Sequence, residues 1–172
     1  MARGFLTSLV GESVVESCIF CLIANEQDEE TEILAKNRDM VCFRDIDPAA
    51  PHHYLVIPRK HIHSCSSLHR KHIDLVERMA EMGKAVLHDQ GFADMNDISM
   101  GFHLPPFISV NHLHLHVLAP SSQISRSMIF KFTPRTESFI LEQRVREQLK
   151  NISPMHHFTT QLRSKKSKHL FE

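Results

Sequence analysis

The sequence predicts an α+β domain in which five strands form an antiparallel sheet and two helices cover one of its faces. Three observations carry this prediction. Short apolar runs bounded by Pro, Asn and Asp recur along the chain, as in strands joined by turns. A long stretch with apolar residues at helical spacing follows the third run, and a shorter one lies near the C-terminus. At 172 residues, the chain has the length of one domain.

The first half of the chain predicts a short helix followed by three strands. We expect the apolar run that starts at Cys18 to form the helix. Residues 32–46 predict two strands, because Asn37 and Asp39 between them favour a turn. A third strand is expected at 53–57, where prolines bound the apolar run on both sides.

The second half predicts one long helix, two more strands and a final helix. The long helix is expected to begin at an N-cap of Ser66 or Ser67 and to stop at Gly91. Strands four and five are expected at 97–104 and 111–118. The last helix is expected near 137–150, and its inward-facing residues would be Phe139, Ile140, Val145 and Leu149.

Three parts of the chain differ in composition. We expect a flexible arm at 1–16, the folded domain at 17–152 and a basic, disordered tail at 153–172.

The charge balance argues against partners that are held by overall charge. Lys plus Arg and Asp plus Glu number 20 each, so neither nucleic acid nor an acidic membrane is favoured. Four cysteines at irregular spacing do not form the framework of a small disulfide-rich secreted domain. No apolar run is long enough to span a membrane, and we expect a cytoplasmic protein with access to the nucleus.

One segment has a periodic pattern that indicates a site. In "VNHLHLHVLAP", residues 110–120, the imidazoles of His112, His114 and His116 alternate with apolar residues. On a strand the three histidines would share one face, about 7 Å apart, and the apolar residues would pack on a core. The histidines would then line a cleft or face solvent.

Three interpretations of this row compete. It could be the polar face of an ordinary strand, although chance explains one histidine better than three. It could bind a metal, but three such positions span about 13 Å, so at most two would bind one ion. It could also catalyse by nucleophilic attack, because a neutral imidazole attacks phosphorus and forms a labile phosphohistidine. The central His114 would attack, His116 would donate to the phosphate or the leaving group, and His112 would orient them.

Two motifs resemble those of the histidine triad (HIT) superfamily. The run "HLHLHVLA" fits its signature of three alternating histidines, and "RDIDPAAPHHYLVIPRKHI" is similar to its nucleotide-binding segment. The resemblance extends from about Cys18 to Pro120 and implies a HIT-like fold. Within the superfamily, the sequence resembles most the third subgroup of the branch known as histidine triad nucleotide-binding proteins.

This resemblance implies a hydrolase that splits adenosine 5′-phosphoramidates and acyl or aminoacyl adenylates and releases AMP. His114 would become nucleotidylated, between His116 and His112. No cofactor and no catalytic metal are expected, and the partners would be small adenylates and a second copy in a homodimer. Asp45 would bind the ribose hydroxyls, and Ile46 would form a wall of the adenine site. Phe43 and Leu55 would be apolar neighbours of the base or core residues. His53 would match the family's fourth histidine, and Ser109 would contact the phosphate or the leaving amine.

Three alternatives stay open at this point. The segment "SMGFHLPPF" is closer to aprataxins, which remove adenylate from DNA ends, and the tail is basic. The chain could also be a nucleotide-binding scaffold without turnover. Finally, "CIFC" resembles a cysteine pair with which some superfamily members bind structural zinc, here together with His53 and His112, although a lone pair of cysteines in an apolar run can be plain core.

Overall fold

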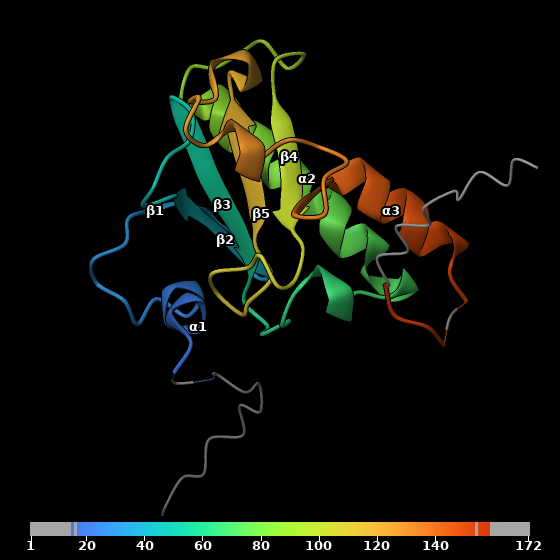
Figure 1. The fold of residues 1–172 in the computed structure, drawn as a ribbon. Helices are drawn as coiled ribbons and strands as arrows, with labels where there is room; N and C mark the ends of the chain where they lie inside the picture. Colours follow the sequence, from blue (N-terminus) through green and yellow to red (C-terminus); the bar gives the residue numbers. More distant parts are fainter. Residues whose placement is uncertain (1–14, 16, 154, 159–172) are drawn as a thin grey trace, which may run out of the picture.

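A six-stranded antiparallel sheet in the order β1-β2-β3-β5-β4-β6 is the centre of the computed structural model (Figure 1). The structure describes residues 15, 17–153 and 155–158. Its strands are β1 (Ile33–Lys36), β2 (Met40–Arg44), β3 (His52–Pro58), β4 (Ser99–His103), β5 (Leu115–Ala119) and β6 (Phe139–Leu141). Its helices are α1 (Ile19–Ala24), α2 (Ile73–Asp89) and α3 (Glu142–Asn151).

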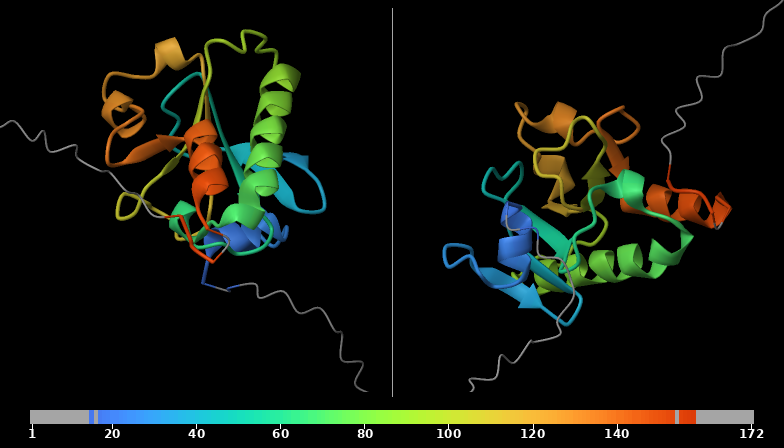
Figure 2. Two further views of the ribbon diagram at one scale, coloured as in Figure 1. Left: turned by 90° about the vertical axis from the view of Figure 1, so that its right-hand side faces the viewer. Right: turned by 90° about the horizontal axis from the view of Figure 1, so that it is seen from below.

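The two faces of the sheet pack against different helices, because side chains alternate along each strand. One face, with α2 and α3, forms the main core, to which the central strands contribute Met40, Cys42, Tyr54, Val56, Leu115 and Val117. Figure 2 shows α2 and α3 side by side along this face. On the other face, α1 packs on a smaller cluster that includes Val41, Phe43, Leu55 and Ile57. His53 and His116 alternate with the core residues and therefore lie on this second face.

The predicted α+β class is confirmed, but the prediction of five strands is wrong. Phe139 and Ile140, expected on the last helix, belong to the sixth strand, where β6 pairs with Gly101–His103 of β4. An aromatic and a β-branched residue at a sheet edge favour a strand. The helix begins only at Glu142, where the polar residues start.

The long helix begins later than the sequence predicts. The chain forms two 3₁₀ turns at Cys65–Ser67 and Arg70–His72, and α2 starts at Ile73. Leu68 between the turns is extended and fully buried, so a continuous helix from 67 is incompatible with its place in the core. The expected stop is confirmed, because Gly91 follows the helix with φ of +87°, a conformation that favours glycine.

The fifth strand is also shorter than expected. It starts at Leu115, and His112–His114 form an irregular segment in which the Leu113 N–H donates to the Ile62 carbonyl. Only His116 of the three histidines lies within the strand, so the row is not one flat face.

The C-terminal end of the described residues packs against the core. Phe158 is buried, and its N–H donates to the carbonyl of Leu68. Packing thus reaches six residues beyond the expected domain end at 152, whereas residues 1–14, 16, 154 and 159–172 of the expected arm and tail lie outside the described residues. Within the described part of the chain, no helix has both the length and the apolar character needed to cross a membrane.

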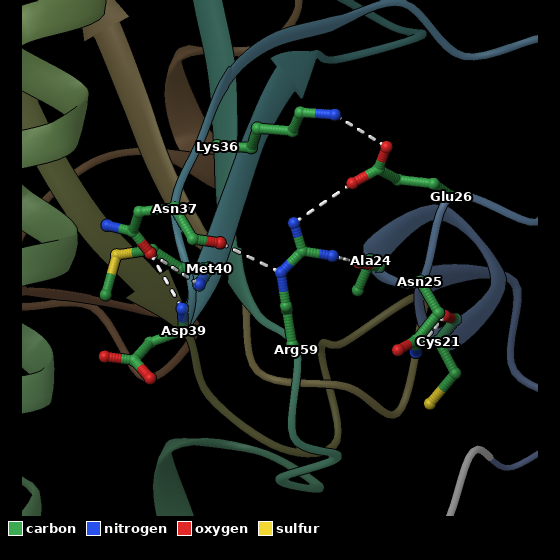
Figure 3. Close-up of polar contacts among 9 residues, drawn as sticks. All are labelled: Cys21, Ala24, Asn25, Glu26, Lys36, Asn37, Asp39, Met40 and Arg59. Atoms are coloured by element: carbon green, nitrogen blue, oxygen red, sulfur yellow. Dashed lines mark hydrogen bonds and ion pairs between the residues drawn. The ribbon is translucent and has the colours of Figure 1, made fainter.

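Arg59 connects α1 to the sheet (Figure 3). Its guanidinium donates to the carbonyls of Ala24 and Asn37 and pairs with the Glu26 carboxylate at 3.1 Å. Helix α1 has only six residues and would not be stable alone, so these contacts hold it against the end of β3 and the turn between β1 and β2.

Candidate active site

The structure places His114 with one ring nitrogen fixed and the other available. Nδ1 lies 2.6 Å from the His112 carbonyl oxygen, which can only accept, so Nδ1 carries the proton. The lone pair is therefore on Nε2. Burial is the main cause that lowers the pKa of His114 below its usual value, and the imidazole is neutral at neutral pH. A neutral ring with a free Nε2 is the form that a nucleophile needs.

A chain of hydrogen bonds sets the proton of His116 in the same way. The Ala49 N–H donates to His53 Nδ1 over 3.0 Å, so the proton of a neutral His53 is on Nε2. That Nε2–H lies 2.9 Å from His116 Nδ1, which must accept. His116 is thus protonated on Nε2, and this buried atom has no hydrogen-bond partner among the described residues. A buried donor without a partner points to a group that binds there.

The surroundings of His53 and His116 hold both imidazoles neutral. Burial is the main cause that lowers the pKa of His53 to about 4. His116 has its pKa lowered well below the usual value by burial and by the neighbouring His114, His103 and His53. Both imidazoles are therefore neutral at neutral pH, and the hydrogen bonds run from Ala49 to His53 and from His53 to His116.

Asp45 lies beside this relay. Its Oδ2 is 3.3 Å from His53 Nε2 and 3.7 Å from His116 Nδ1, and its Oδ1 accepts from the Asp47 N–H. Burial is the main cause that raises the pKa of Asp45. The position expected to bind ribose thus also faces the histidines.

His112 does not face the same space as the other two histidines. Its Nε2–H donates to the Pro58 carbonyl over 2.8 Å, and its Nδ1 points to Cys21 and Cys18, at 3.5 and 3.6 Å from their sulfurs. The prediction that the three imidazoles share one face is wrong, because the chain is irregular before Leu115. His112 acts on the site through its backbone carbonyl, which holds the proton of His114.

Cys18, Cys21, His61 and His112 form a group whose ligand atoms lie within 4.8 Å of one another. Zinc has Zn–S bonds of about 2.3 Å and Zn–N bonds of about 2.0 Å, so tetrahedral coordination puts sulfur and nitrogen about 3.6 Å apart. The sulfur to nitrogen distances here are 3.2, 3.5 and 3.6 Å. Two thiols and two imidazoles, one of which donates its other N–H to a carbonyl, fit a structural zinc.

The group with Cys18, Cys21 and His112 contains His61 instead of the expected His53. His53 lies near the start of β3, opposite Leu118, and contacts His116. His112 precedes β5 and therefore lies near the end of β3, where His61 follows. The antiparallel pairing of β3 and β5 makes His61 the fourth member and excludes His53.

The other expected nucleotide-binding residues surround the histidines in different ways. Ile46 follows Asp45 and is fully exposed, whereas Phe43 and Leu55 are buried with Phe20 in the cluster beneath α1. The Phe20 ring meets that of His114 edge to face at 5.3 Å. Ser109 is exposed in the loop between β4 and β5.

The structure brings into the site His103, to which the sequence pattern assigns no role. The ligand atoms of His103, His114 and His116 lie within 4.8 Å of one another, and His103 Nε2 donates to the Lys131 carbonyl over 3.0 Å. Strand β4 pairs Gly101 with His116 of β5, and two residues further this register brings His103 to the level of His114. Knowledge of the strand register would have identified it.

Comparison with known proteins shows which family this chain belongs to. The protein family described as "Scavenger mRNA decapping enzyme C-term binding" matches residues 17–129. A zebrafish (Danio rerio) protein named adenosine 5′-monophosphoramidase HINT3 is 56% identical over 140 residues, which cover 81% of this chain and 86% of that protein. The mouse (Mus musculus) protein of the same name is 47% identical and covers 72% of this chain and 74% of its own.

Other similarities are more distant. A histidine triad protein from Clostridium difficile has a solved structure that aligns with a TM-score of 0.55 at 30% identity, over 60% of this chain and 90% of that one. Chicken (Gallus gallus) aprataxin is 31% identical over 98 residues, which make up only 30% of its length. Fold, histidine geometry and sequence similarity together establish that this chain belongs to the histidine triad superfamily, with close similarity to the proteins named HINT3.

Proposed function

We propose that this protein hydrolyses adenosine 5′-monophosphoramidates and related adenylates to AMP through a covalent intermediate on His114. One observation carries the proposal: a neutral His114 with its Nδ1 proton held by a carbonyl lies beside a buried His116 Nε2–H that has no partner in the described residues. The activity named for the HINT3 relatives supports it.

In the first half-reaction, Nε2 of His114 attacks the phosphorus. A bond forms between this nitrogen and phosphorus, the P–N bond of the substrate breaks, and the departing nitrogen takes a proton from solvent water and leaves as an amine. The Nδ1–H bond to the His112 carbonyl strengthens as positive charge builds on the ring. In the second half-reaction, water attacks phosphorus and gives a proton to solvent, the bond between phosphorus and Nε2 breaks, AMP leaves, and neutral His114 is restored.

His116 stabilises the charge that develops on the phosphoryl group. Its Nε2–H donates to a phosphoryl oxygen, or to the departing nitrogen, without any change of tautomer, because His53 already holds Nδ1 as an acceptor. His53 is therefore a positioning residue.

The adenosine binds on the Asp45 side of the histidines in this proposal. A carboxylate accepts from two ribose hydroxyls, and the exposed Ile46 next to it covers the base. Phe43 and Leu55 are buried in the cluster with Phe20, so they support this surface from beneath.

AMP release from adenosine 5′-phosphoramidate tests the proposal. We expect the purified full-length protein to release AMP over many turnovers without any added metal ion, because the chemistry uses imidazoles alone. Absence of turnover on this substrate contradicts the proposal. Turnover of adenylated nicked DNA alone would instead support an aprataxin-like activity, and AMP binding without turnover would support a scaffold.

We also propose that Cys18, Cys21, His61 and His112 hold a structural zinc ion, which when bound connects α1 to the segment that carries His114. The purified protein is expected to contain about one equivalent of zinc. Cys21→Ser and His61→Ala should each remove it and lower the unfolding temperature, since structural zinc contributes directly to folding.

Two matched variants control the zinc experiment. Cys42→Ala changes a buried cysteine outside the group, and His53→Gln changes the histidine that the sequence suggested. Both should retain the metal. A full zinc content in Cys21→Ser, or its loss in His53→Gln, would show that the group is assigned wrongly.

The homodimer and the cytoplasmic or nuclear location stay predictions from the sequence.

A further inference from the structure

The last described residues of the chain, 155–158, pack beside the turn that precedes α2 (Figure 1). Phe158 is 2% exposed and belongs to the main core, and its N–H donates to the Leu68 carbonyl over 2.7 Å. Its neighbour His157 is exposed and forms a β-bridge with His69. One buried ring and a short stretch of backbone thus attach this segment, which we call the C-terminal latch (residues 155–158).

Three imidazoles gather where the latch meets this turn; we call His69, His72 and His157 the latch histidines. The ring centroids of His69 and His72 lie 3.8 Å apart, and the ring of His157 lies 5.8 Å from that of His69. The His69 N–H donates to Nδ1 of His72 over 3.2 Å, so a neutral His72 carries its proton on Nε2. Among the described residues, no carboxylate forms an ion pair with any of the three. A positive charge on one ring would therefore face the other rings without a paired carboxylate.

The segments packed around the latch histidines carry several cations. They are Lys60 after β3, Arg70 and Lys71 in the turn, and Lys150 at the end of α3. Asp74 of α2, the carboxylate nearest in the sequence, pairs with Arg78. Burial is the main cause that lowers the pKa of His72 to about 4, and repulsion from His69, Lys60 and His157 adds to it. The docked arrangement therefore favours neutral imidazoles.

We propose that the latch histidines release the C-terminal latch from the core when they gain protons in mild acid. While the latch is docked, His157 lies beside His69 and adds to the repulsion at His72. When the latch leaves, His157 moves away and a proton binds more easily. The released state therefore binds more protons than the docked state, so docking is most stable above the usual histidine pKa of 6.5. Docking weakens as the pH falls from there towards about 4.

Hydrogen exchange of the Phe158 amide in the full-length protein measures the opening of the latch, because the Leu68 carbonyl holds this N–H. We expect its protection factor, corrected for the intrinsic exchange rate at each pH, to fall about tenfold between about pH 7 and about pH 5. The amide of Val56, in the central strand β3, should stay better protected at both pH values, because only unfolding of the sheet exposes it.

His72→Gln separates the latch histidines from a general effect of acid. Glutamine can still accept from the His69 N–H but does not titrate, so the pH dependence at Phe158 should shrink to about twofold or less. His157→Gln should also reduce it, because one of the repelling charges is lost. His156→Gln is the matched control, since His156 is exposed on the same segment and the ring contacts of the latch histidines do not include it. This control should keep the wild-type dependence.

A Phe158 protection factor that stays constant over this pH range would overturn the proposal. The same holds for a pH dependence that is unreduced in either His72→Gln or His157→Gln, or that is lost in His156→Gln. If His72→Gln leaves Phe158 unprotected even at neutral pH, the result for His157→Gln decides. Exchange at Phe158 as slow as at Val56 would show that the segment leaves the core only when the domain unfolds, which also rules out a latch. None of these measurements depends on AMP release, so their outcome is independent of the proposed function.

Discussion

The variant His114→Ala is expected to lose AMP release by a factor of about a thousand or more. His114 is the residue whose Nδ1 proton is fixed by the His112 carbonyl and whose Nε2 is free to attack. Alanine removes the nucleophile and leaves only the contribution of substrate binding. Steady-state kinetics on adenosine 5′-phosphoramidate measures the loss, and AMP binding to the variant shows that the site is still formed.

His52→Asn is the matched control for this variant. His52 precedes His53 on β3, but it hydrogen-bonds the Tyr54 hydroxyl and so lies on the face of the sheet that α2 and α3 cover. This control should keep the wild-type rate. Undiminished turnover in His114→Ala would refute the role of His114 as nucleophile.

The second large effect is expected for His116→Phe, with a fall of about a hundredfold or more in kcat. Phenylalanine occupies the same buried space but has no N–H for the phosphoryl oxygen. The loss should appear as slower formation of the intermediate, which rapid-quench kinetics resolves.

A comparison with His52→Phe separates the loss of a donor from a general effect of the substitution. Thermal unfolding of both variants checks that each is folded. A rate for His116→Phe within a few fold of the wild type would mean that the unpartnered Nε2–H is not used in the reaction.

The sequence predicted the fold class because its strongest signals are local. Asn37 and Asp39 mark a turn whatever surrounds them, and Gly91 ends α2 through its own backbone freedom. Leu68 and the pair Phe139–Ile140 were misassigned because burial against distant parts of the chain determines their conformation.

The same distinction applies to the site. The alternating histidines are visible in the sequence, but the direction of each imidazole depends on where β5 begins, which the pattern does not reveal. His103 and His61 enter through strand register and strand ends, that is, through pairing between distant segments. Single-sequence periodicity contains no such information.

Trapping the covalent intermediate shows whether His114 is the nucleophile. Excess wild-type protein is mixed with adenosine 5′-phosphoramidate, quenched in alkaline denaturant within the first turnover, and mapped by mass spectrometry of its peptides. We expect one adenylyl group on His114, formed and lost at rates that match turnover. An adenylyl group on another residue, or AMP release without any adduct, would contradict it.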